Sequence, residues 1–122
     1  MLRDKQLIKI LLDLNLPSED YAIFGSGPMM AHGIKEANDL DLIVRNNAWK
    51  IVQKEGTPPE IEAWNSWGPG KWDIDKLIDE AEVIEGIRFV RLAEVLKWKK
   101  MVNRPKDADH IKMIEQYLNK TK

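Results

Sequence analysis

Two aspartates spaced two residues apart, Asp39 and Asp41, open an apolar run that ends at Val44. On a β-strand, side chains at positions i and i+2 point to the same face and lie about 6 to 7 Å apart. Two carboxylates held that close repel each other unless a cation lies between them. Oxygen ligands of this kind suit Mg²⁺ (or Mn²⁺), which usually completes its shell with water and substrate phosphates. Such pairs also occur at helix caps and solvated strand ends, so the pair alone leaves its role open.

A glycine-containing turn lies upstream of this pair. Gly25, Ser26 and Gly27 follow the apolar run 21–24 and precede Pro28, a residue that fits the first turn of a helix. Glycine lets the backbone come close to a phosphate, and the N-terminus of a helix offers free N–H donors. Ser26 adds a hydroxyl donor. The turn alone is more typical of structure than of function, because many strand-to-helix turns contain glycine.

Together, the turn and the aspartate pair resemble the signature of the DNA polymerase β-like nucleotidyltransferase superfamily. That signature is Gly-Ser or Gly-Gly, a spacer of about the length between Ser26 and Asp39, and an acid-x-acid pair in an apolar strand. The resemblance implies an α+β fold, with a nucleotidyltransferase-type mixed β-sheet and helices packed against it. It implies an Mg²⁺-dependent transferase that moves a nucleoside monophosphate from a nucleoside triphosphate (NTP) to a hydroxyl acceptor. Asp39 and Asp41 would then be catalytic residues and metal ligands.

The resemblance also implies a third carboxylate on the next strand, flanked by apolar residues. Glu62, between Ile61 and Ala63, is the best match, while Glu60 and Asp73 are alternatives. This residue would act as the base toward the attacking hydroxyl and help to bind a second metal ion. Two metal ions about 3.5 to 4 Å apart would clamp the attacking and leaving oxygens of an in-line displacement.

The C-terminal part of the chain carries a second similarity. Leu-Lys-Trp-Lys at 96–99 and Arg-Pro-Lys-Asp at 104–107 look like the leucine/lysine helix and the Arg-x-Lys-Asp segment of small superfamily members. The resemblance favours Lys99 as a contact to the triphosphate, although a solvated helix face would explain the same cations. The predicted nucleotide-binding residues are Gly25, Ser26, Lys99, Arg104 and Lys106.

Three tryptophans, Trp64, Trp67 and Trp72, surround a Gly-Pro-Gly loop at 68–70. Their rings can stack on a nucleobase or on an acceptor substrate. Tryptophans in such a place more often hold an irregular loop against the core. The sequence leaves both interpretations open.

Two other classes of function remain. Lys35 stands where small superfamily members often have an arginine, a difference that favours a catalytically silent nucleotide-binding module. Small members also often pair with a second polypeptide, which suggests an antitoxin-like interaction protein. We therefore expect a protein partner or a homo-oligomer in addition to the substrates. The substrates would be an NTP and an acceptor that the residues do not identify: a protein, an RNA end or a small molecule.

Composition sets outer limits on these hypotheses. The 122 residues predict a single domain, 1–122, and the net charge of −1 does not imply a general polyanion-binding surface. With no cysteine, the chain has no disulfide and no thiolate metal site. The sequence shows no signal peptide. It also shows no apolar stretch close to the roughly 20 residues that a membrane span needs. We therefore expect a cytoplasmic protein without a membrane segment.

Periodicity predicts the elements that position these residues. Helical spacing and breakers predict helices over 3–15, 29–32, 46–54, 73–81, 92–102 and 105–118. Apolar or alternating runs predict strands over 21–24, 39–44 and 60–64, and a hairpin of 83–84 with 87–90. This order indicates a sheet of about four strands, with the aspartate pair on a central strand.

Overall fold

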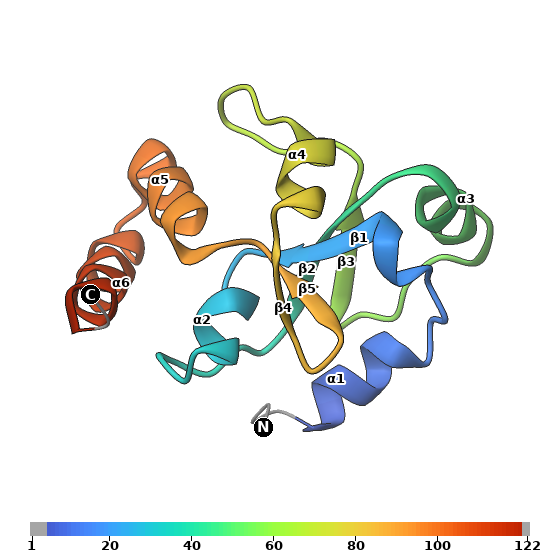
Figure 1. The fold of residues 1–122 in the computed structure, drawn as a ribbon, viewed down its shortest axis with the longest axis horizontal. Coiled ribbons are helices and arrows are strands. Elements are labelled where there is room, and N and C mark those ends of the chain that lie inside the picture. The colour runs from blue at the N-terminus through green and yellow to red at the C-terminus, as the bar shows by residue number, and fades with distance from the viewer. Residues whose placement is uncertain (1–4, 121–122) are drawn as a thin grey trace.

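The computed structural model describes residues 5–120, and its centre is a five-stranded mixed sheet (Figure 1). The strands are β1 (Tyr21–Phe24), β2 (Leu40–Val44), β3 (Ile61–Trp64), β4 (Glu82–Ile84) and β5 (Ile87–Phe89). Their order in the sheet is β3-β2-β1-β5-β4. The pairs β1–β2 and β4–β5 are antiparallel, and the pairs β1–β5 and β2–β3 are parallel. The α+β class is confirmed. The predicted count of about four strands was too low, because both arms of the hairpin join the sheet.

Six helices and one short 3₁₀ turn, η1, connect and cover the strands of residues 5–120. The predicted helix 3–15 is shorter, because Asn15 adopts a left-handed conformation (φ 54°) and Pro17 follows it. Its predicted first two residues lie outside the described part of the chain. The helical elements are α1 (Lys5–Leu12), η1 (Ser18–Asp20), α2 (Gly27–Ala31), α3 (Asn46–Glu55), α4 (Ile74–Asp79), α5 (Leu92–Val102) and α6 (Asp107–Lys120). Within this range, no helix is both long and apolar enough to cross a membrane.

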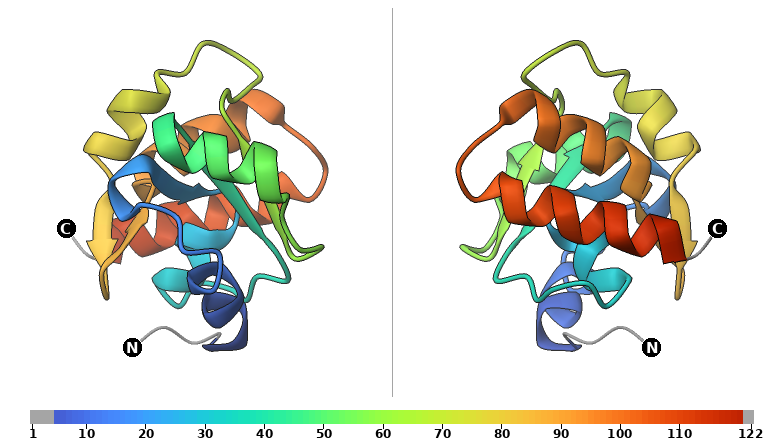
Figure 2. Two further views of the ribbon diagram at one scale, coloured as in Figure 1. Left: turned by 90° about the vertical axis from the view of Figure 1, so that its right-hand side faces the viewer. Right: turned by 90° about the vertical axis from the view of Figure 1, so that its left-hand side faces the viewer.

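The sheet separates two apolar layers. One layer joins α1 and α3 to the sheet face that carries Leu40, Leu42 and Val44. The other joins α4, α5 and α6 to the face that carries Phe24 and Ile43. Figure 1 shows α5 and α6 on one side of the sheet and α1 and α3 on the other, and α5 and α6 lie side by side in both views of Figure 2. Strand β2 is therefore covered on both faces at its Val44 end.

This double cover explains the sequence of β2. Alternation places Asp41 on the same face as Ile43, but closer to the strand start. Asp41 is half-buried and Asp39, one residue before the strand, is exposed. The prediction of a central strand that carries both aspartates is only partly right. Asp39 lies one residue before β2, and the middle strand of the sheet is β1. The polar start and apolar end of β2 reflect where helices cover it.

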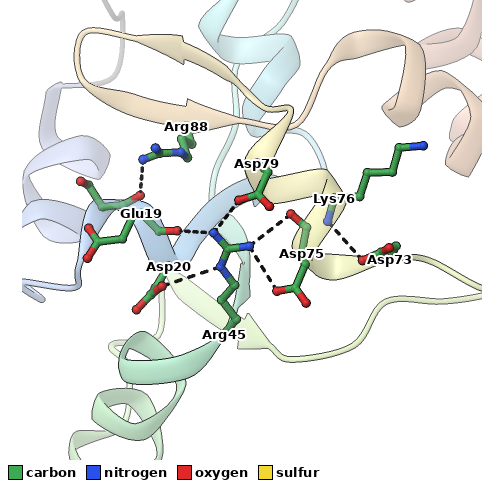
Figure 3. Close-up of polar contacts among 9 residues, drawn as sticks. Glu19, Asp20, Arg45, Asp73, Asp75, Lys76, Asp79 and Arg88 are labelled. Carbon is green, nitrogen blue, oxygen red and sulfur yellow. Dashed lines mark hydrogen bonds and ion pairs between the residues drawn. The ribbon is translucent and has the colours of Figure 1, made fainter.

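Arg45, directly after β2, ties three elements together (Figure 3). Its guanidinium donates to the Asp79 carboxylate at 2.7 Å and to the Asp75 carboxylate at 3.1 Å, both on α4. It also donates to the backbone carbonyl of Glu19 and lies 3.7 Å from the Asp20 carboxylate in η1. These contacts hold α4 over the Val44 end of β2.

Candidate active site

Strand register brings the third predicted carboxylate beside the aspartate pair. Asp41 pairs with Phe24 of β1 on one side and with Glu62 of β3 on the other. Ile61 is buried and Ala63 packs against the opposite apolar layer, so Glu62 shares the face of Asp41. The predicted shared face therefore holds for Asp41, whereas Asp39 precedes β2 and lies outside the paired register. We call Asp39, Asp41 and Glu62 the acid row; their catalytic and metal-binding roles remain predictions.

The acid row carries mutually repelling charges. Burial raises the pKa of Asp41, and the negative charges of Asp39 and Glu62 raise it further. A side-chain hydrogen bond from Trp64 and the charge of Arg104 lower the pKa only in part. The row is therefore a place where a bound cation would relieve repulsion.

The donor chemistry of the row fits Mg²⁺. Within residues 5–120, no three histidine, aspartate or glutamate side chains gather closely enough to form a protein-only metal cage. Mg²⁺ in nucleotide sites usually takes one or two carboxylates and fills its shell with water and phosphate oxygens. Asp39 and Asp41 would supply those carboxylates, with Glu62 near enough to influence the charge of Asp41.

Gly25 lies against Asp41 on the β1 side of the row. Its φ of +64° is left-handed, and a Cβ built there would lie 2.6 Å from Oδ2 of Asp41. A Cβ on Gly27 would instead collide with the side chain of Ile23. Ser26 stands between them at the N-cap position of α2 and is half-buried. The turn therefore needs glycine on both sides of Ser26 to approach the sheet this closely.

The two alternatives for the third carboxylate lie in other surroundings. Asp73 accepts a hydrogen bond from the backbone N–H of Lys76 at 3.1 Å and caps α4. Glu60 is half-buried just before β3, and its backbone carbonyl accepts from the N–H of Leu40. Glu62 is the candidate whose register position lies opposite Asp41.

The three predicted nucleotide-binding cations separate into different environments. Lys99 is 1% exposed, and its ammonium lies 3.5 Å from Asp107 and 3.1 Å from Nδ1 of His110. Lys106 is exposed, whereas Arg104 is half-buried. A direct contact between Lys99 and a nucleotide stays a prediction, since in this structure the ammonium already has a buried anionic partner.

Asp107 holds Arg104 in place. The fully buried Asp107 carboxylate accepts hydrogen bonds from the backbone N–H of Arg104 at 3.0 Å, from its Nε at 2.8 Å and from its Nη2 at 3.1 Å. Burial alone would raise the pKa of Asp107, but these bonds and the charge of Lys99 bring it down to about 2. Burial also lowers the pKa of Lys99, and the Asp107 charge opposes that change. We call Lys99, Arg104 and Asp107 the ion cluster.

Arg104 connects the ion cluster to the acid row. It lines a pocket of about 410 Å³ together with Asp41, Trp64 and Trp98. Its guanidinium lies 5.2 Å from the ring centre of Trp98, and its charge acts on Asp41. Arg104 is thus the cation of the predicted set that shares a pocket with the acid row.

The tryptophans divide between the two interpretations. Trp67 stacks on Phe24, with ring centres 4.4 Å apart, and Trp72 meets the same ring edge-on at 5.7 Å. Trp98 joins this group, 5.2 Å from Trp67. Trp67 and Trp72 therefore pin the loop 65–73 to the core. Trp67 also lines the pocket, beside Trp64, which is 45% exposed.

Two residues of this region were missed by sequence reasoning. Trp98 and Asp107 appeared only as members of the two C-terminal motifs, at 96–99 and 104–107, without a role of their own. The three-residue spacing between Arg104 and Asp107 was a usable signal, because oppositely charged residues three apart in sequence can pair. No signal of this kind exists for Trp98, whose neighbours come from β1 and the loop 65–73.

The geometry defines an α+β domain with a carboxylate row beside a glycine turn and an aromatic pocket. The chain gives no significant match to any family model, any curated protein or any solved structure.

Proposed function

We propose that the protein is an Mg²⁺-dependent nucleotidyltransferase that moves a nucleoside monophosphate from an NTP to a hydroxyl acceptor. The observation that carries this proposal is the acid row: Asp41 lies between Asp39 and Glu62 and directly against Gly25. A cation there would relieve repulsion among the carboxylates. The lack of cysteine agrees with a reducing, cytoplasmic setting, which is part of the proposal.

Each residue has a defined task in this proposal. Asp39 and Asp41 hold the metal, which when bound neutralises phosphate charge and orients the phosphates. The turn at Gly25 and Ser26 accommodates the triphosphate, because its backbone approaches Asp41 without an intervening side chain. Glu62 accepts the proton of the attacking hydroxyl. Arg104 supplies positive charge on the pocket side of Asp41.

A catalytically silent module is the second candidate, and one observation favours it. Lys99, the cation expected at the triphosphate, is buried in the ion cluster. A protein that binds nucleotide without transferring it, or that uses this fold to bind a partner protein, would not need a free lysine there. The two candidates differ in what a change at Glu62 does.

Metal-dependent binding is the first test. Isothermal titration with ATP, GTP, CTP and UTP, in Mg²⁺ and in EDTA, should show NTP binding that requires the metal. Asp39→Asn should abolish the Mg²⁺-dependent part, because one of the two acidic ligands becomes neutral. Asp109→Asn, an exposed aspartate on α6, is the matched control and should bind as the unchanged protein does. Full binding by Asp39→Asn would refute the proposed site.

Glu62→Gln then separates binding from chemistry. The variant should keep most NTP–Mg²⁺ affinity, while transfer of label from α-labelled NTP into cell extract falls by on the order of 10² to 10⁴. If the unchanged protein binds NTP but transfers no label, the result would instead support the silent module. Unreduced transfer by Glu62→Gln would remove Glu62 as the base.

A further inference from the structure

A cavity of about 590 Å³ lies where the C-terminal ends of α1 and α3 meet. Residues 13–16, directly after α1, form one side, and residues within 51–58, from the second half of α3 onward, form the other. Both helices pack on the sheet face of Leu40 and Leu42, whereas Asp41 lies on the opposite face. This cavity is therefore separate from the acid row, and its volume lies within the roughly 300 to 1,000 Å³ of small-molecule sites.

The apolar part of the cavity lining is aliphatic. It consists of half-buried side chains from both sides of the cavity: Leu14, Leu16, Ile51, Val52 and Pro58. Among the described residues that line the cavity, none carries an aromatic ring. The surface on offer therefore suits a flexible methylene chain rather than a planar ring that needs a stacking partner.

The polar part of the lining favours positive charge. Asp13 and Glu55 supply carboxylates, and the described lining residues include no lysine or arginine. Since α1 ends at Leu12 and α3 ends at Glu55, both helices direct their C-terminal ends to this place. The last turn of a helix carries partial negative charge on its backbone carbonyls, each of which has two acceptor lone pairs. An ammonium group would gain from the carboxylates and from the carbonyls.

One of the two carboxylates already has a partner outside the lining. The ammonium of Lys9 lies 3.0 Å from the Asp13 carboxylate, but the two side chains are 75% and 65% exposed. Exposed pairs of this kind contribute little, so a second ammonium can join or replace Lys9 there. Glu55 forms no ion pair with any residue of the described range 5–120. Glu55 is therefore the carboxylate at which the cavity lacks a cation.

We propose that this cavity binds an aliphatic polyamine, a methylene chain with an ammonium at each end. One ammonium pairs with Glu55 and the carbonyls that end α3, the methylenes lie on the aliphatic lining, and the other ammonium pairs with Asp13. An inorganic cation would leave the aliphatic lining without a contact, and a neutral chain would leave both carboxylates without one. The inference does not rest on the proposed function, because the cavity and the pocket at Asp41 share no lining residue.

The first test is isothermal titration with putrescine, cadaverine and spermidine, in the absence of NTP. Butanediol and n-butylamine are the comparison ligands, because they have the carbon chain of putrescine with no charge and with one charge. Polyamines should bind, and butanediol should not. Putrescine should bind about 2- to 5-fold more tightly than n-butylamine, the gain expected from one more partly exposed ion pair. Backbone amide chemical shifts should change most at residues 13–16 and 55–58.

Variants of α3 then test the site. Glu55→Gln should weaken putrescine binding by about 2- to 5-fold, while Asp109→Asn, which removes an exposed carboxylate on α6, should not weaken it. Val52→Lys places an ammonium in the aliphatic lining and should weaken binding by more than about tenfold, because like charges brought together repel strongly. Gln53→Lys adds the same charge at an exposed position outside the lining and is the matched control. Circular dichroism checks that each variant folds, and the exposed position of Glu55 keeps the test open if Val52→Lys does not fold.

Four results would overturn the inference. Equal putrescine binding by the unchanged protein and Glu55→Gln would remove Glu55 from the site. Equal binding of butanediol and putrescine would make the cavity a neutral apolar site. Binding of MgCl₂ that Glu55→Gln removes, with no binding of putrescine, would make it an inorganic cation site. Loss of putrescine binding in Asp39→Asn, and not in Glu55→Gln, would move the polyamine to the acid row.

Discussion

Asp41 and Asp107 are both shielded aspartates, but the two regions around them treat a negative charge in opposite ways. In the acid row, burial and two neighbouring carboxylates raise the pKa of Asp41. In the ion cluster, hydrogen bonds from Arg104 and the charge of Lys99 overcome burial and lower the pKa of Asp107 to about 2. The fold pairs the Asp107 carboxylate with cations and leaves the Asp41 carboxylate among like charges, and pKa values perturbed in this way cluster at functional sites.

The largest expected effect lies in the ion cluster. Asp107→Asn removes the charge that faces the buried Lys99 and Arg104, and an unpaired buried charge typically costs about 3 to 5 kcal/mol. Urea denaturation should show this loss in the free energy of unfolding. Asp109→Asn, exposed and two residues along the same helix, should change stability little. Equal stabilities of the two variants would contradict the assignment of Asp107 as the centre of the cluster.

The same contrast predicts how stability depends on pH. The folded-state pKa of Asp107, about 2, lies below its ordinary value of 3.8, so its stabilising contribution is complete above about pH 4. That contribution should fade as the pH falls toward 2. Stability of the unchanged protein should therefore fall over this interval more steeply than stability of Asp107→Asn.

Gly25→Ala should break the acid row from the β1 side. A left-handed φ costs a non-glycine residue about 1 to 2 kcal/mol, and here the new Cβ would also press on the Asp41 carboxylate. Gly86→Ala is the control, because Gly86 also has a positive φ, +80°, and nothing within 4 Å of the new Cβ. Thermal unfolding should show a larger loss for Gly25→Ala, and titration should show weaker NTP–Mg²⁺ binding for that variant alone.

The smallest expected effect is a gain in stability, from Asp41→Asn. Asp41→Asn removes a half-buried charge repelled by Asp39 and Glu62, so without metal it should stabilise the protein by on the order of 1 kcal/mol. Because the pKa of Asp41 is raised, this gain should be present at neutral pH and disappear as the pH falls through that pKa. Metal-dependent NTP binding should be lost in the same variant. A destabilised Asp41→Asn would mean that the row is already satisfied within the fold.

Much of the fold follows from local pattern. The helix over 92–102 and the strand over 21–24 were predicted with the bounds that α5 and β1 have. The strand is an apolar run stopped by Gly25, and the helix stops at Asn103, which takes a left-handed φ of 53°. The predicted alternation around Glu62 also holds, since Ile61 and Ala63 face away from it and Glu62 lies opposite Asp41 in the register.

The sequence by itself determined most of the elements and the alternation that lines up carboxylates on one face, because these depend on residues close together in the chain. Only the tertiary structure decided that Gly25 lies against Asp41, that Lys99 is buried against Asp107, that Arg104 faces the pocket, and that Trp67 stacks on Phe24 at the pocket wall while Trp64 stays exposed. Helical spacing puts Lys97 and Lys99 on different sides of α5, but it does not say which side is covered; Lys97 is exposed and Lys99 is buried against Asp107 of α6. The environment of a long side chain depends on which distant segment packs over it, and local spacing carries no information about that packing.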